Sequence, residues 1–238
     1  MDSPAVRVEG LSKTYGLVRA LDRVSFGVEA GRGLALVGHN GAGKSTLLEI
    51  LAGLRAASAG VVEVLGAPAA TRPAALRAAV GVVAHRNYLY PRLSAEENLR
   101  FFGRLWGVQD LEPRIDRLLA DFGLGLRRAE PVTRYSRGMA RRIAIARAVL
   151  PEPRILLLDE PFDGLDESGV EVVHRILNRL RAGGTAIVVS SHRLEAARPI
   201  ADRVLVLERG RVALERGLDG IDEGGFADLC RDAILGRR

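Results

Sequence analysis

The chain has 238 residues, of which 35 are basic and 29 acidic, giving a formal net charge of +6. An apolar fraction of 47% is ample for a packed core and excludes a disordered chain. Its longest aliphatic runs fall far short of the roughly 18 residues that cross a bilayer, and we expect no secretory signal. The single cysteine, Cys230, excludes an internal disulfide framework. We therefore expect a cytoplasmic protein.

Arginine supplies almost all of the positive charge, because Lys13 and Lys44 are the only lysines among the 35 basic residues. The arginines are spread along the chain and interleaved with acids, so we expect no nucleic-acid partner. A lysine retained in such a composition indicates a position where a compact ammonium fits and a planar guanidinium does not.

The first third of the chain is typical of short β-strands separated by glycine-rich breaks. The predicted strands are Val6–Glu9, Val24–Val28, Leu34–Val37, Val61–Leu65 and Val80–Ala84. A helix is predicted over Lys44–Leu54. From Ala95 to Leu150 the apolar residues follow helical spacing instead, which indicates a helical insert.

The strand pattern resumes at Ile155–Asp159, Ala186–Ser190 and Val204–Leu207, with an amphipathic helix between the first two. Apolar strands separated by helices indicate a parallel sheet covered on both faces. We predict a single domain over residues 1–238, with a helical subdomain at about 86–150 and a tail at 217–238. Within the tail, Phe226–Leu235 is predicted to form a short helix.

A glycine-rich segment, Gly38-His39-Asn40-Gly41-Ala42-Gly43-Lys44-Ser45, lies between a predicted strand and a predicted helix. It fits the pattern G-x-x-x-x-G-K-[ST], in which glycines let backbone N–H groups surround a phosphate chain at a helix N-terminus. Lys44 would reach the β and γ phosphates, and Ser45 would offer its hydroxyl to Mg²⁺. The retained lysine strengthens this prediction of a phosphate site.

Two carboxylates, Asp159 and Glu160, end the apolar strand that begins at Ile155. They would lie at the carboxyl edge of the parallel sheet, where the ligands of α/β proteins bind. With the phosphate loop on the same chain, we expect Asp159 to belong to the magnesium shell and Glu160 to polarise an attacking water.

Four further segments make the chain resemble the ATP-binding subunits of ABC transporters. Tyr15 matches the aromatic residue that stacks on adenine, and Tyr135–Met139 stands where that family has its Leu-Ser-Gly-Gly-Gln signature. Gly164–Asp166 matches the loop at the dimer seam, and Ser191–His192 matches the switch histidine. The resemblance implies an α/β P-loop NTPase fold of the ABC type, with a mixed β-sheet core, an antiparallel β subdomain and an inserted helical subdomain.

The resemblance further implies an ATPase that uses ATP and Mg²⁺ and closes as a head-to-tail homodimer. Each phosphate loop would face Ser136 and Gly138 of the other copy, whereas Asp166 would lie at the seam. Glu160 would position water and His192 would touch the γ-phosphate. The residues implied for nucleotide binding are Tyr15, Gly38, His39, Asn40, Gly41, Ala42, Gly43, Lys44, Ser45 and Thr46.

The chain departs from the family pattern at two places. In the signature, Arg137 replaces a glycine and Met139 replaces the glutamine. His85 stands where the family usually has a glutamine that reaches Mg²⁺ and the attacking water. Because imidazole offers nitrogen to a cation that prefers oxygen, both a metal-binding and a non-binding role for His85 are open.

His85, the following Tyr88-Leu89-Tyr90 and Leu93–Phe102 are similar to the haem exporter ATP-binding subunits of cytochrome c biogenesis, the CcmA type. That resemblance implies a polytopic membrane permease as partner, haem-handling membrane proteins beside it, and attachment to the inner face of the cell membrane. A drug, lipid or polysaccharide exporter is the first alternative. An ABC ATPase acting on DNA or ribosomes is the second.

Overall fold

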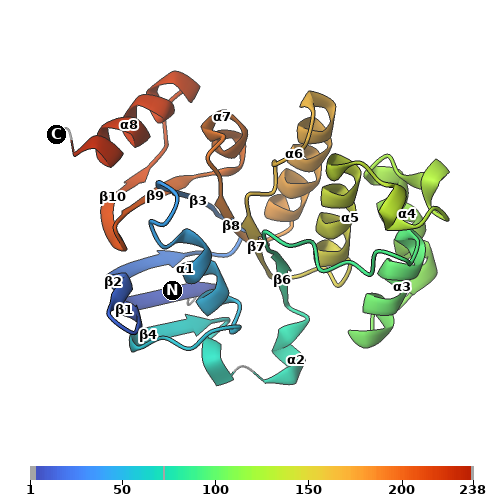
Figure 1. Ribbon diagram of the computed structural model, residues 1–238, viewed down its shortest axis with the longest axis horizontal. Helices are drawn as coiled ribbons and strands as arrows, with labels where there is room; N and C mark the ends of the chain where they lie inside the picture. Colours follow the sequence, from blue (N-terminus) through green and yellow to red (C-terminus); the bar gives the residue numbers. More distant parts are fainter. Residues whose placement is uncertain (1–3, 72, 237–238) are drawn as a thin grey trace.

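The computed structural model in Figure 1 describes residues 4–71 and 73–236. In chain order its strands and helices are β1 (Val6–Tyr15), β2 (Val18–Val28), β3 (Gly33–Val37), α1 (Lys44–Leu51), β4 (Ala59–Val64), β5 (Ala67–Pro68), η1 (Ala69–Thr71), α2 (Ala74–Arg77), β6 (Val80–Val83), α3 (Ala95–Leu105), α4 (Leu111–Asp121), η2 (Gly125–Arg127), η3 (Val132–Arg134), α5 (Arg137–Val149), β7 (Ile155–Asp159), α6 (Glu167–Ala182), β8 (Ala186–Ser190), α7 (Leu194–Ala197), η4 (Arg198–Ile200), β9 (Arg203–Glu208), β10 (Arg211–Gly217) and α8 (Glu223–Leu235). The α and η labels mark α-helices and 3-10 helices.

The central six-stranded sheet has the order β10-β9-β3-β8-β7-β6. Strand β10 is antiparallel to β9 and the other neighbours are parallel, so the sheet is mixed. Side chains of β7 alternate between the two faces: Ile155 and Leu157 join the cluster that contains α1 and the second sheet. Leu156 and Leu158 join the cluster that contains α5 and α6. The predicted sheet with two covered faces is confirmed.

The second sheet is antiparallel, with the order β2-β1-β4-β5. The predicted strand Val61–Leu65 corresponds to β4, whereas the predictions for β1 and β2, Val6–Glu9 and Val24–Val28, were too short. Both strands continue into an exposed hairpin that turns at Gly16, whose φ is 55°. Apolar and polar residues no longer alternate where the hairpin extends beyond the core. The sequence pattern therefore could not predict the outer half of the hairpin.

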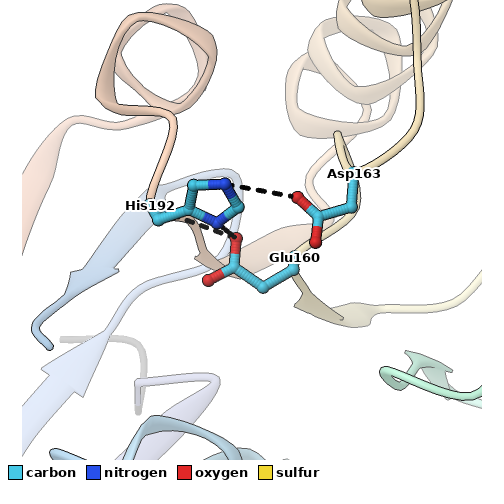
Figure 2. A group of neighbouring side chains, drawn as sticks. All are labelled: Glu160, Asp163 and His192. Carbon is cyan, nitrogen blue, oxygen red and sulfur yellow. Dashed lines mark hydrogen bonds and ion pairs between the residues drawn. The ribbon is translucent and has the colours of Figure 1, made fainter. Parts of the chain in front are cut away.

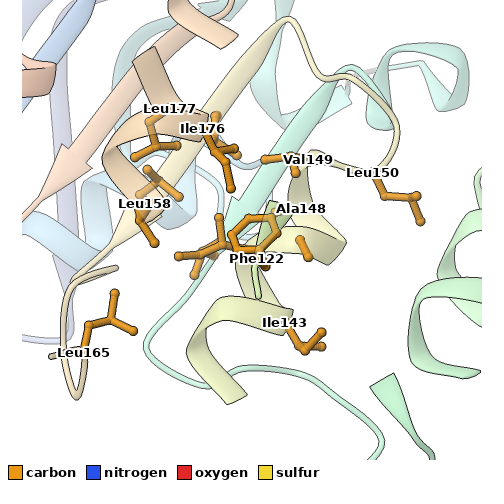
Figure 3. Packing of buried hydrophobic residues seen from close by; sticks show 14 of the residues in the cluster. Phe122, Ile143, Ala148, Val149, Leu150, Leu158, Leu165, Ile176 and Leu177 are labelled. Carbon is orange, nitrogen blue, oxygen red and sulfur yellow. The ribbon is translucent and has the colours of Figure 1, made fainter. Parts of the chain in front are cut away.

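Helices α3, α4 and α5 lie together at one end of the molecule (Figure 1). Helix α3 begins with a capping box, in which Ser94 accepts from the backbone N–H of Glu97 and the Glu97 carboxylate accepts from that of Ser94. Figure 3 shows how this end joins the sheet: Phe122, after α4, packs in one cluster with Ile143 of α5 and Leu158 of β7. The helical segment and the sheet therefore share buried side chains.

The C-terminal helix α8 covers the β3–β9 part of the central sheet. Its Phe226 and Cys230 are fully buried in a cluster with Ala35, Val37 and Val206. Burial raises the pKa of the Cys230 thiol to about 12. The predicted helix over Phe226–Leu235 is present and starts three residues earlier, where Asp222 caps it by accepting from the backbone N–H of Gly225. The tail packs on the core of its own chain.

Several element limits differ from the sequence-based ones for local reasons. Helix α1 ends at Leu51 rather than Leu54, because Gly53 has a φ of 73° and ends the helical run. Strand β10 was not predicted, since it lies at the sheet edge with five of its seven residues exposed and none fully buried. Within the described residues, no helix combines the length and apolar character needed to cross a membrane. The division into a core, a helical subdomain at 86–150 and a tail at 217–238 stays a prediction.

Candidate nucleotide site

The glycine-rich loop runs from the end of β3 into α1 and passes so close to other backbone that side chains are excluded. A Cβ on Gly38 would lie 2.3 Å from the carbonyl oxygen of Leu207. A Cβ on Gly43 would lie 2.7 Å from that of Ala20, and φ at Gly43 is 107°. Only glycine fits both positions. The loop conformation is thus fixed by packing, with the N-terminus of α1 facing the space above it.

Lys44, the first residue of α1, is 7% exposed. Its Nζ donates to the carbonyl oxygens of Gly38 at 2.7 Å and His39 at 3.1 Å. Burial lowers the pKa of Lys44, and the nearby Glu160 and Asp159 carboxylates oppose that shift. The ammonium therefore sits at the centre of the loop, where a phosphate chain on the loop would meet it.

Asp159 ends β7 and is 6% exposed. Its Oδ1 accepts a hydrogen bond of 2.6 Å from the hydroxyl of Ser190, the residue paired with it on β8. The same hydroxyl accepts from the backbone N–H of Glu160 at 3.1 Å. Ser190 thus orients both carboxylate residues. Sequence reasoning missed it, although a polar residue at the end of an apolar strand was a visible signal.

Glu160, His192 and Asp163 form a group of contacts in front of the loop, shown in Figure 2. Oε2 of Glu160 accepts from the backbone N–H of His192 at 3.0 Å and lies 2.9 Å from the ring atom Nδ1. Nε2 of the same ring lies 3.7 Å from Oδ1 of Asp163. Glu160 has a positive φ of 49°, which turns its side chain off the strand direction. Asp163 was not predicted, since it matches no motif in the sequence.

A cavity of about 380 Å³ collects most of the predicted site residues. The predicted residues that line it are Asn40, Gly41, Gly43, Lys44, Ser45, Thr46, His85, Asp159, Glu160 and His192. Ala20 and Asp163 line it as well, without having been predicted. Cationic, hydroxyl and carboxylate groups therefore face one space that can accept a phosphate chain.

The donors in this cavity fit Mg²⁺. Ser45 offers a hydroxyl and Asp159 a carboxylate, and these oxygen ligands suit a hard cation. His85 is exposed and lines the same cavity, but it offers nitrogen. Ser45 and Asp159 are the residues that would hold the ion, and His85 is less suited to do so.

Two buried arginines of α5 hold the segment that carries His85. Arg141 donates to the carbonyl oxygen of Ala84 at 2.9 Å. Arg147 donates to those of Val82, Asn87 and Tyr88 at 3.0 to 3.1 Å. Burial lowers the pKa of Arg147 to about 10. The position of His85 is therefore tied to the helix that begins at the predicted signature.

Tyr15 lies at the end of β1, and its side chain is 39% exposed. It is not among the described residues that line the cavity. Its ring lies 5.0 Å from Nζ of Lys13 and 5.6 Å from the guanidinium of Arg55. Lys13 also donates to the carbonyl oxygen of Ala56 at 2.8 Å. This second lysine thus braces the aromatic ring and the chain after α1.

The signature segment and the seam loop touch each other, away from the cavity. Ser136 caps α5 by accepting from the backbone N–H of Met139 at 3.2 Å. A Cβ on Gly138 would lie 2.7 Å from the carbonyl oxygen of Gly164, so this contact requires glycine. Asp166 caps α6 and accepts from the backbone N–H of Gly169 at 2.9 Å. Among the described residues that line the cavity, none comes from 136–139 or 166.

Comparison with known proteins places the chain in a family. A model of the family described as ABC transporter matches residues 21–163, which is more than half of the chain. The chain belongs to the ABC transporter family. It is the ATP-binding and ATP-hydrolysing subunit type of that family, and the fold class predicted from the sequence is confirmed.

Curated relatives of this ABC subunit come from several bacteria. The daunorubicin resistance ATP-binding protein DrrA3 of Streptomyces coeruleorubidus is 37% identical over 92% of this chain and 70% of its own length. The Nod factor export ATP-binding protein I of Sinorhizobium fredii is 37% identical over 89% of this chain, which spans only 62% of that protein. The ABC transporter ATP-binding protein NatA of Bacillus subtilis is 34% identical over 87% of this chain and 85% of its own length.

Solved structures agree with this ABC assignment. A structure of an ATP-binding subunit of an ABC transporter superposes with a TM-score of 0.85 and 32% identity, covering 98% of this chain and 94% of that one. A dimeric post-hydrolysis state of the ATP-binding cassette MJ0796 bound to ADP and Pi gives a TM-score of 0.84 and 27% identity, covering 91% of this chain and 100% of that one. None of these relatives and structures is named for haem.

Proposed function

We propose that two copies of this chain close head to tail around ATP and Mg²⁺, so that each cavity is completed by residues 136–139 of the other copy. The support is geometric. In one copy the phosphate loop and the carboxylates meet in one cavity, whereas the signature segment lies outside it. Ser136 is the N-cap of α5 and Gly138 is its second residue, so backbone N–H groups at this helix start can donate to a phosphate brought against them.

Within one copy, we assign binding of the triphosphate to the loop and to Lys44. The backbone N–H groups of the loop and the N-terminus of α1 donate to phosphate oxygens. Ser45 and Asp159 hold Mg²⁺, which when bound neutralises phosphate charge. Tyr15 lies at the edge of the site, where its ring supports the adenine.

Glu160 and His192 carry the hydrolytic step in this proposal. Oε2 of Glu160 is fixed by the backbone and the ring of His192, at 3.0 and 2.9 Å. A carboxylate so fixed at the cavity wall can orient an attacking water and take its proton. In this assignment, the imidazole of His192 contacts the γ-phosphate of ATP bound in the cavity. This Glu160–His192 contact inside the cavity that holds Lys44 is the observation that carries the function.

The test is a Glu160→Gln variant, which keeps the shape of the side chain and removes its basic oxygen. We expect ATP to convert this variant into a stable dimer, measured by light scattering after gel filtration, with turnover lowered by at least about a hundredfold. Glu171→Gln, at an exposed position of α6, is the matched control and should behave as wild type. A Glu160→Gln chain that stays monomeric with ATP contradicts the head-to-tail proposal.

The proposed permease partner docks on exposed aromatic side chains of the segment that follows His85 in the sequence. Tyr88, Tyr90 and Phe101 are 60%, 47% and 42% exposed. Tyr90 and Phe101 contact edge to face, with ring centroids 4.9 Å apart. Exposed aromatic rings held in a fixed arrangement are typical anchors for a partner. Attachment through them would place the chain at the inner face of the cell membrane, and copurification with a polytopic membrane protein tests this.

For the transported substrate, we propose export of a drug, lipid or polysaccharide. An export role is supported by the curated relatives named for drug resistance and for Nod factor export. Haem handling in cytochrome c maturation is the second candidate. It is favoured by His85 in the cavity wall and by the aromatic residues that follow it. Deleting the gene discriminates between the two: loss of haem-staining c-type cytochromes supports the haem role, and their persistence supports the exporter.

A further inference from the structure

Asp163 adds a third ligand-type side chain to Glu160 and His192, and the proposed hydrolysis does not use it. One donor atom from each of the three residues lies within 4.8 Å of the others. Figure 2 shows the imidazole between the two carboxylates. We propose that these three side chains bind a transition metal ion of the Zn²⁺ class in the nucleotide-free subunit, and that the bound ion inhibits ATP turnover.

The donor set selects the class of ion. One imidazole nitrogen and two carboxylate oxygens suit Zn²⁺ or Co²⁺, which accept mixed nitrogen and oxygen ligands. Three protein ligands with water in the remaining position is a known arrangement for Zn²⁺. Mg²⁺ prefers oxygen alone in octahedral geometry, which Ser45 and Asp159 supply elsewhere in the cavity. The two sites therefore differ in ligands and in preferred metal.

The donor atoms of the three side chains need to move only slightly closer together to bind one ion. Ligands about 2.0–2.2 Å from Zn²⁺ lie roughly 3.4 Å from one another. The side chains of His192 and Asp163 are 60% and 34% exposed, so they can turn toward one ion, whereas that of Glu160 is 14% exposed and fixed. The cavity of about 380 Å³ also has room for the ion's waters.

The surrounding cations leave the two carboxylates available. Nζ of Lys44 donates to the loop carbonyls, and the Arg141 guanidinium donates to the carbonyl oxygen of Ala84. Arg193, next to the histidine, donates to the carbonyl oxygens of Phe162 and Leu165, 3.2 and 3.3 Å away. It thereby fixes the chain on both sides of Asp163. Lys44 interacts electrostatically with Glu160, and Arg141 with Asp163 and Glu160. The site therefore attracts a divalent ion through its donor atoms rather than through an excess of negative charge.

Inhibition follows because the ion would occupy the carboxylate and the imidazole assigned to turnover. This consequence rests on the proposed roles of Glu160 and His192, whereas metal binding itself does not. The two parts are therefore tested by separate measurements.

Binding is tested on the tag-free full chain, freed of nucleotide and titrated with Co²⁺. We expect a visible absorption band of protein-bound Co²⁺, which Zn²⁺ displaces. Asp163→Asn should weaken Co²⁺ binding at least about tenfold. Asp228→Asn is the matched control, because Asp228 is exposed on α8 and pairs there with Arg231. If Asp163→Asn binds Co²⁺ with wild-type affinity, the proposed metal site is wrong. It is also wrong if His85→Gln loses Co²⁺ binding while Asp163→Asn keeps it.

Inhibition is tested by measuring ATP turnover with free Zn²⁺ buffered far below the ATP concentration. Each variant's rate is divided by its own rate in chelator. The Zn²⁺ concentration for half inhibition should rise at least about tenfold in Asp163→Asn and stay unchanged in Asp228→Asn. Binding that depends on Asp163 without inhibition overturns the inhibitory part alone. Failure of the proposed hydrolytic role is detected separately, by wild-type ATP turnover in Glu160→Gln without Zn²⁺.

Discussion

Replacing Ser190 by alanine should destabilise the nucleotide-free subunit and impair its catalysis together. The Ser190 hydroxyl is fully buried and donates to the Asp159 carboxylate at 2.6 Å. A hydrogen bond to a charged group contributes about 1.5–3 kcal/mol. The hydroxyl also accepts from the backbone N–H of Glu160, but this N–H has a second acceptor in the carbonyl oxygen of Ser190 at 3.1 Å. We expect the free energy of unfolding to fall by about 2–3 kcal/mol.

The assay is urea unfolding followed by Trp106 fluorescence and circular dichroism, without nucleotide. Thr185→Val is the control, because the buried Thr185 hydroxyl donates at 2.9 Å to the neutral carbonyl oxygen of Pro153. That substitution should cost about 1 kcal/mol. ATP turnover of Ser190→Ala should fall, since both carboxylates lose their common support. A Ser190→Ala variant no less stable than Thr185→Val refutes the reasoning that the charge on Asp159 strengthens this bond.

Three further predictions concern the loop and the tail. Lys44→Arg should weaken binding of a fluorescent ATP analogue at least about tenfold although charge is kept, because a guanidinium does not fit between the loop carbonyls; wild-type affinity would contradict this. Gly43→Ala should unfold at lower urea than wild type, because its Cβ would meet the Ala20 carbonyl oxygen at 2.7 Å, whereas Gly217→Ala meets nothing within 4 Å and should be neutral. The free energy of unfolding should fall as pH rises from about 9 toward 12, because the Cys230 thiol ionises only after unfolding; Cys230→Ala should remove this part of the slope in pH-dependent urea titrations.

The sequence was sufficient for the parts of the fold whose pattern is set by burial. Strands β3, β7 and β8 are buried along their whole length, and each was predicted at its position to within a residue. The phosphate loop was predicted because a fixed spacing of glycines, lysine and serine carries its chemistry. The outer parts of β1 and β2 were not predicted. Their side chains are mostly exposed, so burial does not require apolar residues at alternate positions.

The missed site residues depend on contacts between distant segments. Ser190 lies 31 residues from Asp159 in sequence and meets it only because β7 and β8 are in register. Asp163 faces His192 because the chain turns back after β7, and no spacing in the sequence expresses that turn. The placement of Tyr15 beside Lys13 and Arg55 likewise depends on how β1 meets the segment after α1.

The cluster around Phe122 has a consequence for unfolding. Because Phe122 and Ile143 of the helical end share buried contacts with Leu158 and Ile176, exposing one group exposes the other. Amide hydrogens of α5 should therefore exchange with solvent as slowly as those of β7, in one cooperative unit. An excised fragment of residues 86–150 would leave an apolar face uncovered and would associate rather than fold alone.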